Sequence, residues 1–210
     1  MIEDIHGTIK EIKRELRLSM NGVTSTLQRR QGLDYKINFG VEIPRLKAIA
    51  EKYTQDKELA LALWKDNIRE CKILAIYLLP EEEYRNVAEE WIADTRYTEI
   101  ADRLAMHILN RIDCAATKAL SWIHIEEGLF NYCGYMTLSH LFRNGSTLNN
   151  EEEQLLFSNI ADLIESEERL SLKKCAFNTL QHYLEADAER EGRLKATLHD
   201  KRKTGLLELL

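Results

Sequence analysis

The sequence predicts an all-α fold, and three observations carry this prediction. The 210 residues include only 2 Pro and 9 Gly, so few positions interrupt long helical stretches. Apolar side chains recur at helical spacing along most of the chain, and runs of β-branched residues are scarce. Apolar residues make up 44% and charged residues 30%, a balance that favours a soluble globular protein over a disordered one.

The N-terminal part predicts five helices. In the first, over residues 2–19, the apolar side chains form one stripe, at Ile5, Ile9, Ile12, Leu16 and Met20. A second helix includes Val23 and Leu27 and ends near Gly32, because glycine readily takes the backbone conformation of a helix end. Three more helices are predicted over residues 44–54, 57–66 and 68–79.

The C-terminal part predicts further helices over residues 82–94, 98–110, 113–124, 128–142, 150–166, 170–185 and 187–199. Pro80 ends the helix before them, and the glutamates at 81–83 suit the positive end of the next helix. The clearest loop is Asn144-Gly145-Ser146-Thr147. After it, Asn149 or Asn150 can cap the following helix.

The helices follow a rhythm. Successive helix pairs are about 35–40 residues apart, which is the range of HEAT-like arrays. Such arrays stack helix pairs into a superhelix with an extended concave surface. We therefore expect an all-α HEAT-like helical-repeat solenoid, curved around a concave groove. No linker divides the chain, so we expect a single domain over 1–210, with 200–210 as a loosely docked tail.

Charge and composition exclude several classes of protein. No stretch is long and apolar enough to cross a membrane, and the N-terminus lacks the basic and apolar regions of a signal peptide, which favours a cytoplasmic protein. No glycine-rich phosphate loop or metal-ligand spacing is present, so we expect no cofactor and no metal.

The four cysteines are far apart in the sequence, at 71, 114, 133 and 175. We predict that they are buried thiols in a reducing compartment.

Residues 38–75 contain the most specific pattern. Gly40 suits a tight turn, and Pro44 suits the first turn of the helix that follows, where its missing N–H is no loss. The pattern reads FGV-x-x-P, then LW at Leu63-Trp64, then RE-x-K-x-LA from Arg69. It resembles the DNA alkylation repair family of HEAT-like repeat proteins, the alkylpurine DNA glycosylases of the AlkD type. The resemblance covers most of residues 20–185 and is weaker in the second half.

The resemblance implies double-stranded DNA as partner and excision of cationic alkylated bases as activity. In such a site a carboxylate inside an aromatic cleft stabilises positive charge on the sugar and positions water. Asp102 matches the catalytic aspartate of the family. Thr98 stands where a Trp is expected, with Tyr97 beside it, and Asn178 stands where a second Trp is expected, with Phe177 beside it.

The resemblance also suggests residues that contact DNA. The basic position of the family falls near Cys133, where this chain has no arginine, and Tyr132 next to it is a candidate for the groove. The remaining candidates for phosphate contacts are basic side chains near the two ends of the chain, at Lys10, Arg14, Arg17, Lys173 and Lys174.

Plainer structural interpretations stay open for the same residues. Asp102 could pair with Arg103 or Arg96 on the surface, and Tyr132 could belong to the core. The three tryptophans are predicted to be core residues, at 64, 91 and 122. The basic residues of the first helix could simply face solvent. A net charge of −6 counts mildly against DNA binding, although one basic face can exist on an acidic protein.

Two functions therefore remain. The first is a monomeric DNA repair protein that excises alkylated purines with Asp102. The second is a noncatalytic helical-repeat scaffold that binds DNA or a protein partner along its concave face.

Overall fold

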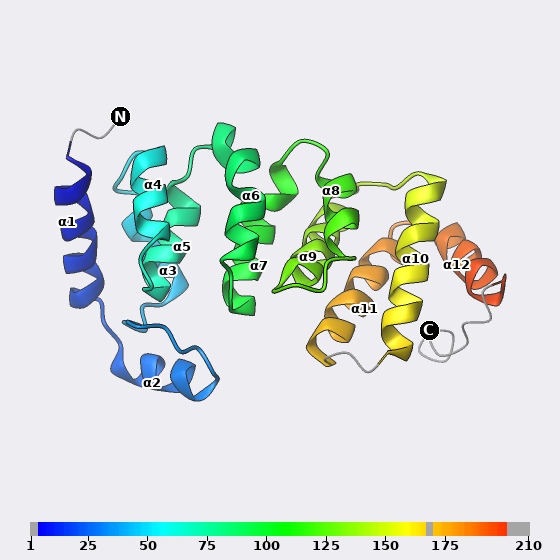
Figure 1. The fold of residues 1–210 in the computed structure, drawn as a ribbon, viewed down its shortest axis with the longest axis horizontal. Coiled ribbons are helices and arrows are strands. Elements are labelled where there is room, and N and C mark those ends of the chain that lie inside the picture. Colours follow the sequence, from blue (N-terminus) through cyan, green and yellow to red (C-terminus); the bar gives the residue numbers. More distant parts are fainter. Residues whose placement is uncertain (1–3, 167–169, 201–210) are drawn as a thin grey trace. The chain divides into compact units, whose positions relative to one another are not determined.

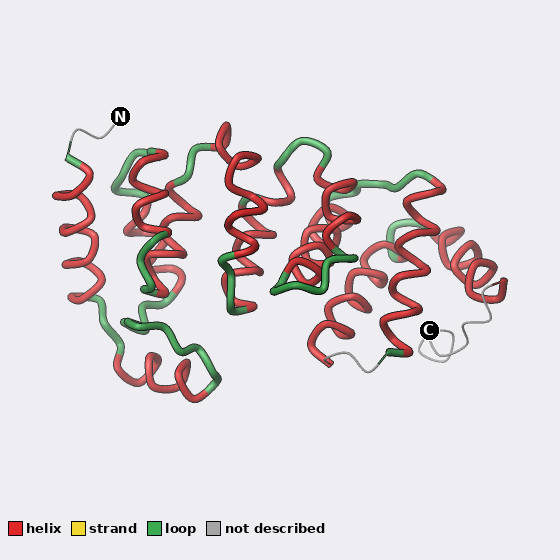
Figure 2. Tube along the Cα trace, viewed as in Figure 1, coloured by secondary structure: helices red, strands yellow, loops and turns green. Residues whose placement is uncertain are grey.

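The computed structural model describes residues 4–166 and 170–200, and their secondary structure is helical (Figures 1 and 2). The helices up to residue 93 are α1 (Ile5–Leu18), α2 (Gly22–Arg30), α3 (Ile43–Ala50), α4 (Lys57–Trp64), α5 (Arg69–Leu78), the 3-10 helix η1 (Glu81–Glu83) and α6 (Tyr84–Ala93). The others are α7 (Thr98–His107), η2 (Leu109–Arg111), α8 (Ala115–Trp122), α9 (Phe130–Arg143), α10 (Asn150–Glu165), α11 (Leu170–Leu184) and α12 (Ala188–Asp200). The predicted all-α class is confirmed.

Contacts between Cα positions divide the chain into two compact units. The first unit ends at Val87 and the second begins at Ala88, so that α6 runs across the division. The single domain, the curvature and the concave groove stay predictions. The tail expected over 200–210 lies, apart from the last residue of α12, outside the described residues.

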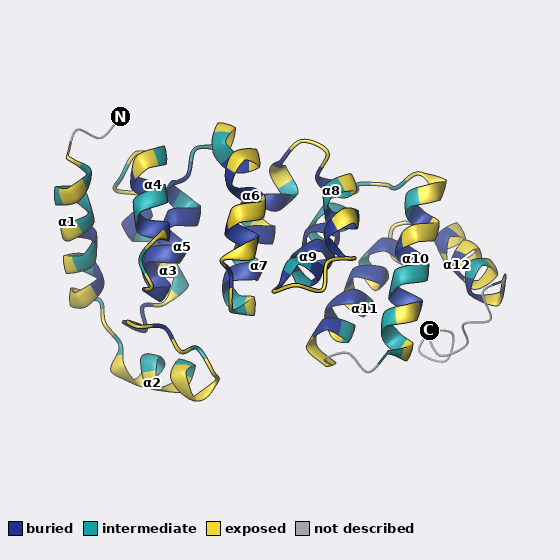
Figure 3. Cartoon of the chain, viewed as in Figure 1, coloured by how far each residue is buried: buried dark blue, intermediate teal, exposed yellow. Residues whose placement is uncertain are grey.

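The core of the first unit lies around α5. Every residue of this helix except Tyr77 is buried, whereas α1 buries only Ile12 and Leu16 (Figure 3). α5 packs against α3 and α4, and α4 also contacts α1. Helix α2 differs from these helices because it buries none of its residues.

Polar residues at the start of α5 hold the turn that precedes α3. The side chain of Glu70 is fully buried, and its two carboxylate oxygens accept hydrogen bonds from the backbone N–H groups of Phe39 (3.1 Å) and Val41 (3.2 Å). Arg69, 2% exposed, donates to Glu70 (3.1 Å) and to the carbonyl of Val41 (2.9 Å). This buried ion pair therefore satisfies backbone groups that would otherwise lie unpaired away from water.

Gly40 lies at the centre of the same turn, with φ at +69°. A Cβ atom added there would lie 2.2 Å from the carbonyl oxygen of Asn21, at the start of α2. The position therefore needs glycine for two reasons: its backbone conformation and the close approach of α2. This agrees with the tight turn predicted from the sequence.

In the second unit α9 contacts α7, α8 and α11. Gly134 allows the approach of α8, because an added Cβ would lie 2.7 Å from the carbonyl oxygen of Ala119. On the side of α11, the buried hydroxyl of Thr179 donates to the carbonyl of Tyr135 (2.9 Å). Helix α9 is thus fixed on three sides, and residues that project from it have defined positions.

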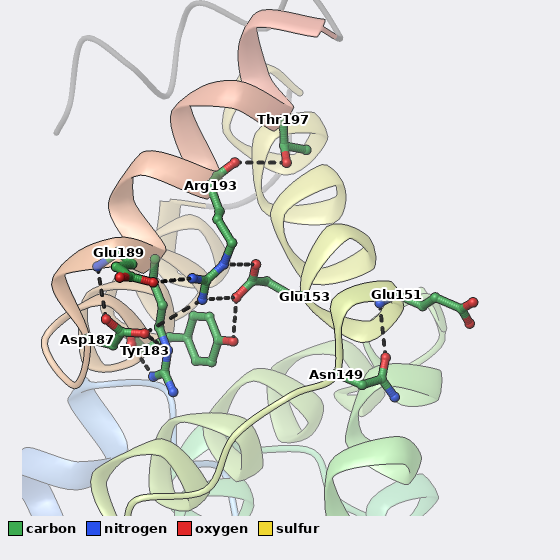
Figure 4. A network of polar contacts seen from close by, with 9 residues as sticks. Asn149, Glu151, Glu153, Tyr183, Asp187, Glu189, Arg193 and Thr197 are labelled. Carbon is green, nitrogen blue, oxygen red and sulfur yellow. Dashed lines mark hydrogen bonds and ion pairs between the residues drawn. The ribbon is translucent and has the colours of Figure 1, made fainter.

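A polar network attaches α12 to α10 and α11 (Figure 4). The buried carboxylate of Glu153 accepts two hydrogen bonds from Arg193 (2.8 and 2.9 Å) and one from the hydroxyl of Tyr183 (2.7 Å). Arg190 lies 4.1 Å from the centroid of the Tyr183 ring and donates to the Tyr183 carbonyl (2.7 Å). The hydrogen bonds that Arg193 donates hold the pKa of Glu153 below its ordinary value. The pair therefore helps to attach α12 at every pH at which Glu153 is ionised.

Several details correct the sequence-based expectations. Met20 is 63% exposed and does not continue the buried stripe of α1, because the helix ends at Leu18. Cys114 is exposed, and its positive φ of 56° at the start of α8 places it outside the core, unlike the buried Cys71. The predicted helix 98–110 ends at His107 and continues as a 3-10 turn. The three tryptophans are buried, as predicted.

Replacing Glu70 with Gln tests the ion pair that holds the turn. The variant keeps the shape but removes the buried negative charge that pairs with Arg69, so we expect a loss of about 3–5 kcal/mol in the free energy of unfolding, measured with urea. Glu58→Gln, at an exposed position of α4, is the control and should change stability by less than about 0.5 kcal/mol. A loss below about 1 kcal/mol for Glu70→Gln would contradict this account.

Candidate functional site

Asp102 on α7 and Tyr132 on α9 form a polar contact between two packed helices. The Tyr132 hydroxyl donates a 2.9 Å hydrogen bond to Oδ1 of Asp102, and both side chains are half-buried. No ion pair of Asp102 is seen among the described residues, although the charge of Arg103 acts on its carboxylate. The other carboxylate oxygen, Oδ2, accepts no hydrogen bond from any residue that the structure describes.

Burial dominates the electrostatics of this pair. Loss of solvent raises the pKa of Asp102 above 3.8, while the hydrogen bond from Tyr132 and the charge of Arg103 lower it only in part. Burial, followed by the charge of Asp102, raises the pKa of Tyr132, so its hydroxyl stays a neutral donor. Asp102 is therefore a partly desolvated carboxyl group whose hydrogen-bond partner, Tyr132, is neutral.

Two thiols lie close enough to sense the charge of Asp102. Burial and then Asp102 raise the pKa of Cys175 to about 12, and the same causes raise the pKa of Cys133. Cys175 donates a long S–H contact to the Tyr132 carbonyl (4.0 Å). Thiols with such raised pKa values remain protonated near neutral pH, so they pack against the site and do not act as nucleophiles.

The other residues expected around Asp102 have mixed positions. Tyr97 is half-buried and immediately precedes α7, and Thr98 is the exposed first residue of that helix. On α11, Phe177 is half-buried and Asn178 is exposed. In the described part of the chain, the side chain of Asp102 makes a hydrogen bond with Tyr132 and none with the side chain of Thr98 or Asn178. The position near Cys133 is fully buried, so it could not present a basic side chain to a phosphate.

The candidate phosphate-binding residues also differ from one another. Lys173 is half-buried, and its ammonium donates to the carbonyls of Ile164 (2.9 Å) and Ser166, where it satisfies the C-terminal end of α10. Lys174 next to it is exposed. Lys173 therefore has a structural role that the sequence did not indicate.

Helix α1 presents an exposed basic face. Lys10, Arg14 and Arg17 are exposed, and their spacing of four and three residues places them on one side of the helix. Lys13, by contrast, pairs with Asp66 at 2.9 Å. The three exposed cations are thus available to an anionic ligand.

Comparison with known proteins identifies the family. Residues 12–192 match the sequence profile of the family described as "DNA alkylation repair enzyme". The chain belongs to this family. It is also similar to a solved structure described as "A new family of proteins related to the HEAT-like repeat DNA glycosylases with affinity for branched DNA structures". The TM-score is 0.77 at 18% identity, and the match covers 90% of this chain and 81% of that one.

This similarity shows an all-α HEAT-like repeat fold, as the rhythm of the helices predicted. No curated protein matches the sequence. Within residues 4–166 and 170–200, no helix is long and apolar enough to cross a membrane. The same residues contain no cluster of three or more His, Cys, Asp or Glu side chains that could hold a metal ion.

The electrostatics of Asp102 predict an effect on stability. Its raised pKa means that the folded protein binds the proton more tightly than the unfolded chain, so stability falls as pH rises through the window between the two pKa values. Above that window the ionised Asp102 destabilises the fold. Asp102→Asn should therefore raise the free energy of unfolding at neutral pH, by roughly 0.5–2 kcal/mol.

Urea unfolding at neutral pH and near pH 4 measures this effect. The gain should be smaller at the lower pH, because protonation of Asp102 in the wild type removes the charge that destabilises the fold. Asp113→Asn, at an exposed position, is the control for removing one negative charge. A variant Asp102→Asn that is less stable than wild type at neutral pH would show that the carboxylate is well compensated in the fold.

Proposed function

We propose that this protein binds DNA and hydrolyses the N-glycosidic bond of a cationic alkylated purine through Asp102. The observation that supports this most is the contact of Asp102 with Tyr132: a half-buried carboxylate without an ion pair among the described residues, fixed by one neutral donor. Such an anion attracts a positive charge more strongly than a solvated or paired one. The family and its HEAT-like fold provide the DNA context.

The proposed reaction needs one carboxylate and one water molecule. The bond between C1′ and the alkylated purine breaks, and its electron pair leaves with the base, which becomes neutral. The positive charge passes to the sugar, where the ionised Asp102 stabilises it. Water then attacks C1′, and its proton passes through Asp102 to solvent. The products are a free alkylpurine and an abasic site.

DNA binding itself is assigned to exposed cations. In the first unit these are Lys10, Arg14 and Arg17 on α1, which make no ion pair among the described residues. In the second unit Lys174 is the exposed candidate, because Lys173 is occupied by carbonyls of the protein. Lys and Arg that neutralise phosphates release counterions, so this contribution weakens as salt rises.

A second candidate function is DNA binding without catalysis. It is favoured by the exposed polar side chains of Thr98 and Asn178, at positions where the resemblance implies tryptophans. Each aromatic ring that stacks on a base contributes about 1–3 kcal/mol in other nucleic-acid complexes. A site without the two tryptophans would therefore bind a base in its cleft less tightly. The affinity for branched DNA stated for the similar solved structure makes branched DNA a ligand to test beside duplex.

The α1 face predicts a salt-dependent binding defect. Replacing Lys10, Arg14 and Arg17 together with Gln should weaken duplex binding and lower the slope of log K against log salt by up to about 2.7, near 0.9 per lost phosphate contact. The control replaces exposed cations outside α1, at Lys36, Lys47 and Lys65, with Gln. Equal defects in the two triple variants would mean that only net charge matters.

Release of methylated purines from alkylated duplex DNA tests catalysis. Asp102→Asn should reduce the release rate by about 10²–10³-fold, because the amide carries no negative charge. Tyr132→Phe should cause a smaller loss, since the carboxylate remains without its fixed orientation. Asp113→Asn should release bases at the wild-type rate.

The outcomes of this assay separate the two functions. If Asp102→Asn retains the wild-type release rate, Asp102 is not the catalytic residue. If the wild type binds DNA and releases no alkylated base, the noncatalytic function holds instead.

A further inference from the structure

The connection between α1 and α2 carries an unusual amount of exposed apolar surface. Leu18 is 78% exposed, Met20 63%, Val23 73% and Leu27 51%. These four side chains, which we call the α1–α2 corner, follow one another within ten residues of sequence. Since α2 buries none of its residues, the fold gains little from keeping them apolar. Several large exposed apolar side chains so close in sequence are typical of an interaction site.

The apolar side chains of α2 lie on one face with an arginine. Val23, Leu27 and Arg30 are spaced by four and three residues, which places them on the same side of the helix. Together with Gly22 and Thr26 they line one shallow hollow on the surface. The face therefore combines aliphatic contact area with a guanidinium group.

The charged residues within the segment that carries the corner are all basic. Residues 16–33 include Arg17, Arg29 and Arg30 and no acidic residue, in a chain whose net charge is −6. Arg29 pairs with Asp34 at 3.8 Å, whereas Arg17 and Arg30 make no ion pair among the described residues. Such a surface is complementary to a polyanion that also exposes apolar groups.

The opposite side of α2 holds the helix in place through polar contacts. The backbone N–H of Asn21 donates to the Phe39 carbonyl (2.9 Å), and the Ser25 hydroxyl donates to the Asn38 carbonyl (2.8 Å). The side chain of Asn21 also caps α2 by accepting from the N–H of Thr24 (3.1 Å). The corner is thus presented by a helix whose position does not depend on the corner's own side chains.

We propose that the α1–α2 corner binds unpaired bases at a DNA branch point, with Arg17 and Arg30 on the flanking phosphates. This rests on the proposed DNA-binding function. Within an intact duplex the base faces are stacked, and only edges, sugars and phosphates are accessible. At a branch point or an unpaired end the faces are exposed, and aliphatic side chains such as Leu and Met are the residues that proteins place against unstacked base steps. Arginine also stacks on base faces.

The test compares two DNA probes at one salt concentration. One is a three-way junction with unpaired nucleotides at the branch, and the other is a linear duplex with the same number of phosphates. In the double variant Val23→Ser/Leu27→Ser, junction affinity should fall by at least about 5-fold, because a base–side-chain contact is lost, while duplex affinity stays at the wild-type value. Leu155→Ser/Leu170→Ser removes two exposed leucines elsewhere and should change neither affinity.

Each other outcome overturns the proposal in a recognisable way. If the double variant binds junction and duplex as the wild type does, the corner is not a base contact, although DNA binding stands. If it weakens both probes equally, the corner contacts duplex. A wild type that binds neither probe removes the proposed DNA function as well.

Two further measurements cover other occupants of the corner. Light scattering that shows a wild-type dimer converted to a monomer by the double variant would assign the corner to a second copy of the chain. Sedimentation with vesicles of phosphatidylcholine and phosphatidylserine that is lost in the variant would assign it to an anionic lipid surface. Either result would replace DNA as the ligand of this surface.

Discussion

The first unit depends on the buried carboxylate of Glu70. Its two oxygens accept hydrogen bonds from the backbone N–H groups of Phe39 and Val41, on either side of Gly40. Arg69 donates to the carbonyl of Val41. A turn with so many buried polar groups would be costly without these partners. The same turn then holds α2 through Asn21 and Ser25, so one ion pair fixes both the entry to α3 and the helix that carries the exposed corner.

This arrangement separates stability from surface chemistry. Apolar burial in the first unit comes from α5 and its neighbours, whereas α2 is placed by hydrogen bonds to a turn. A helix placed in this way can carry any side chain on its outer face at little cost to the fold.

In the second unit the candidate functional residue does affect stability. Asp102 lies where α7 packs on α9, and its burial both raises its pKa and destabilises the fold. A destabilising charge at such a position is consistent with a functional role.

The sequence predicted the helices well because their signals are local. Caps such as Asp56 and Asn149 bind the first N–H groups of their helices, and the small number of glycines and prolines left little choice between helix and loop. The buried tryptophans followed from apolar neighbours at helical spacing. The sequence-based prediction failed where the local backbone conformation decides whether a residue is buried. Cys114 is an example, because its positive φ could not be predicted from the residue type.

The candidate site was predicted less completely because its contacts join residues far apart in the sequence. Asp102 and Tyr132 are separated by 30 residues, and no local pattern indicates that the hydroxyl of one reaches the carboxylate of the other. Lys173 likewise resembles an ordinary surface cation, and only the end of α10 shows that it binds carbonyls.

The contact between Asp102 and Tyr132 also limits what the site can do. Tyr132 is a neutral donor whose own pKa is raised, so it fixes the carboxylate without neutralising it. An arginine in its place would form an ion pair, lower the pKa of Asp102 and cancel most of the field that a cationic substrate would experience. A hydroxyl therefore suits stabilisation of a transient positive charge better than a basic partner would. The same reasoning separates the two functions, because a protein that only binds DNA gains nothing from a desolvated anion that repels phosphates.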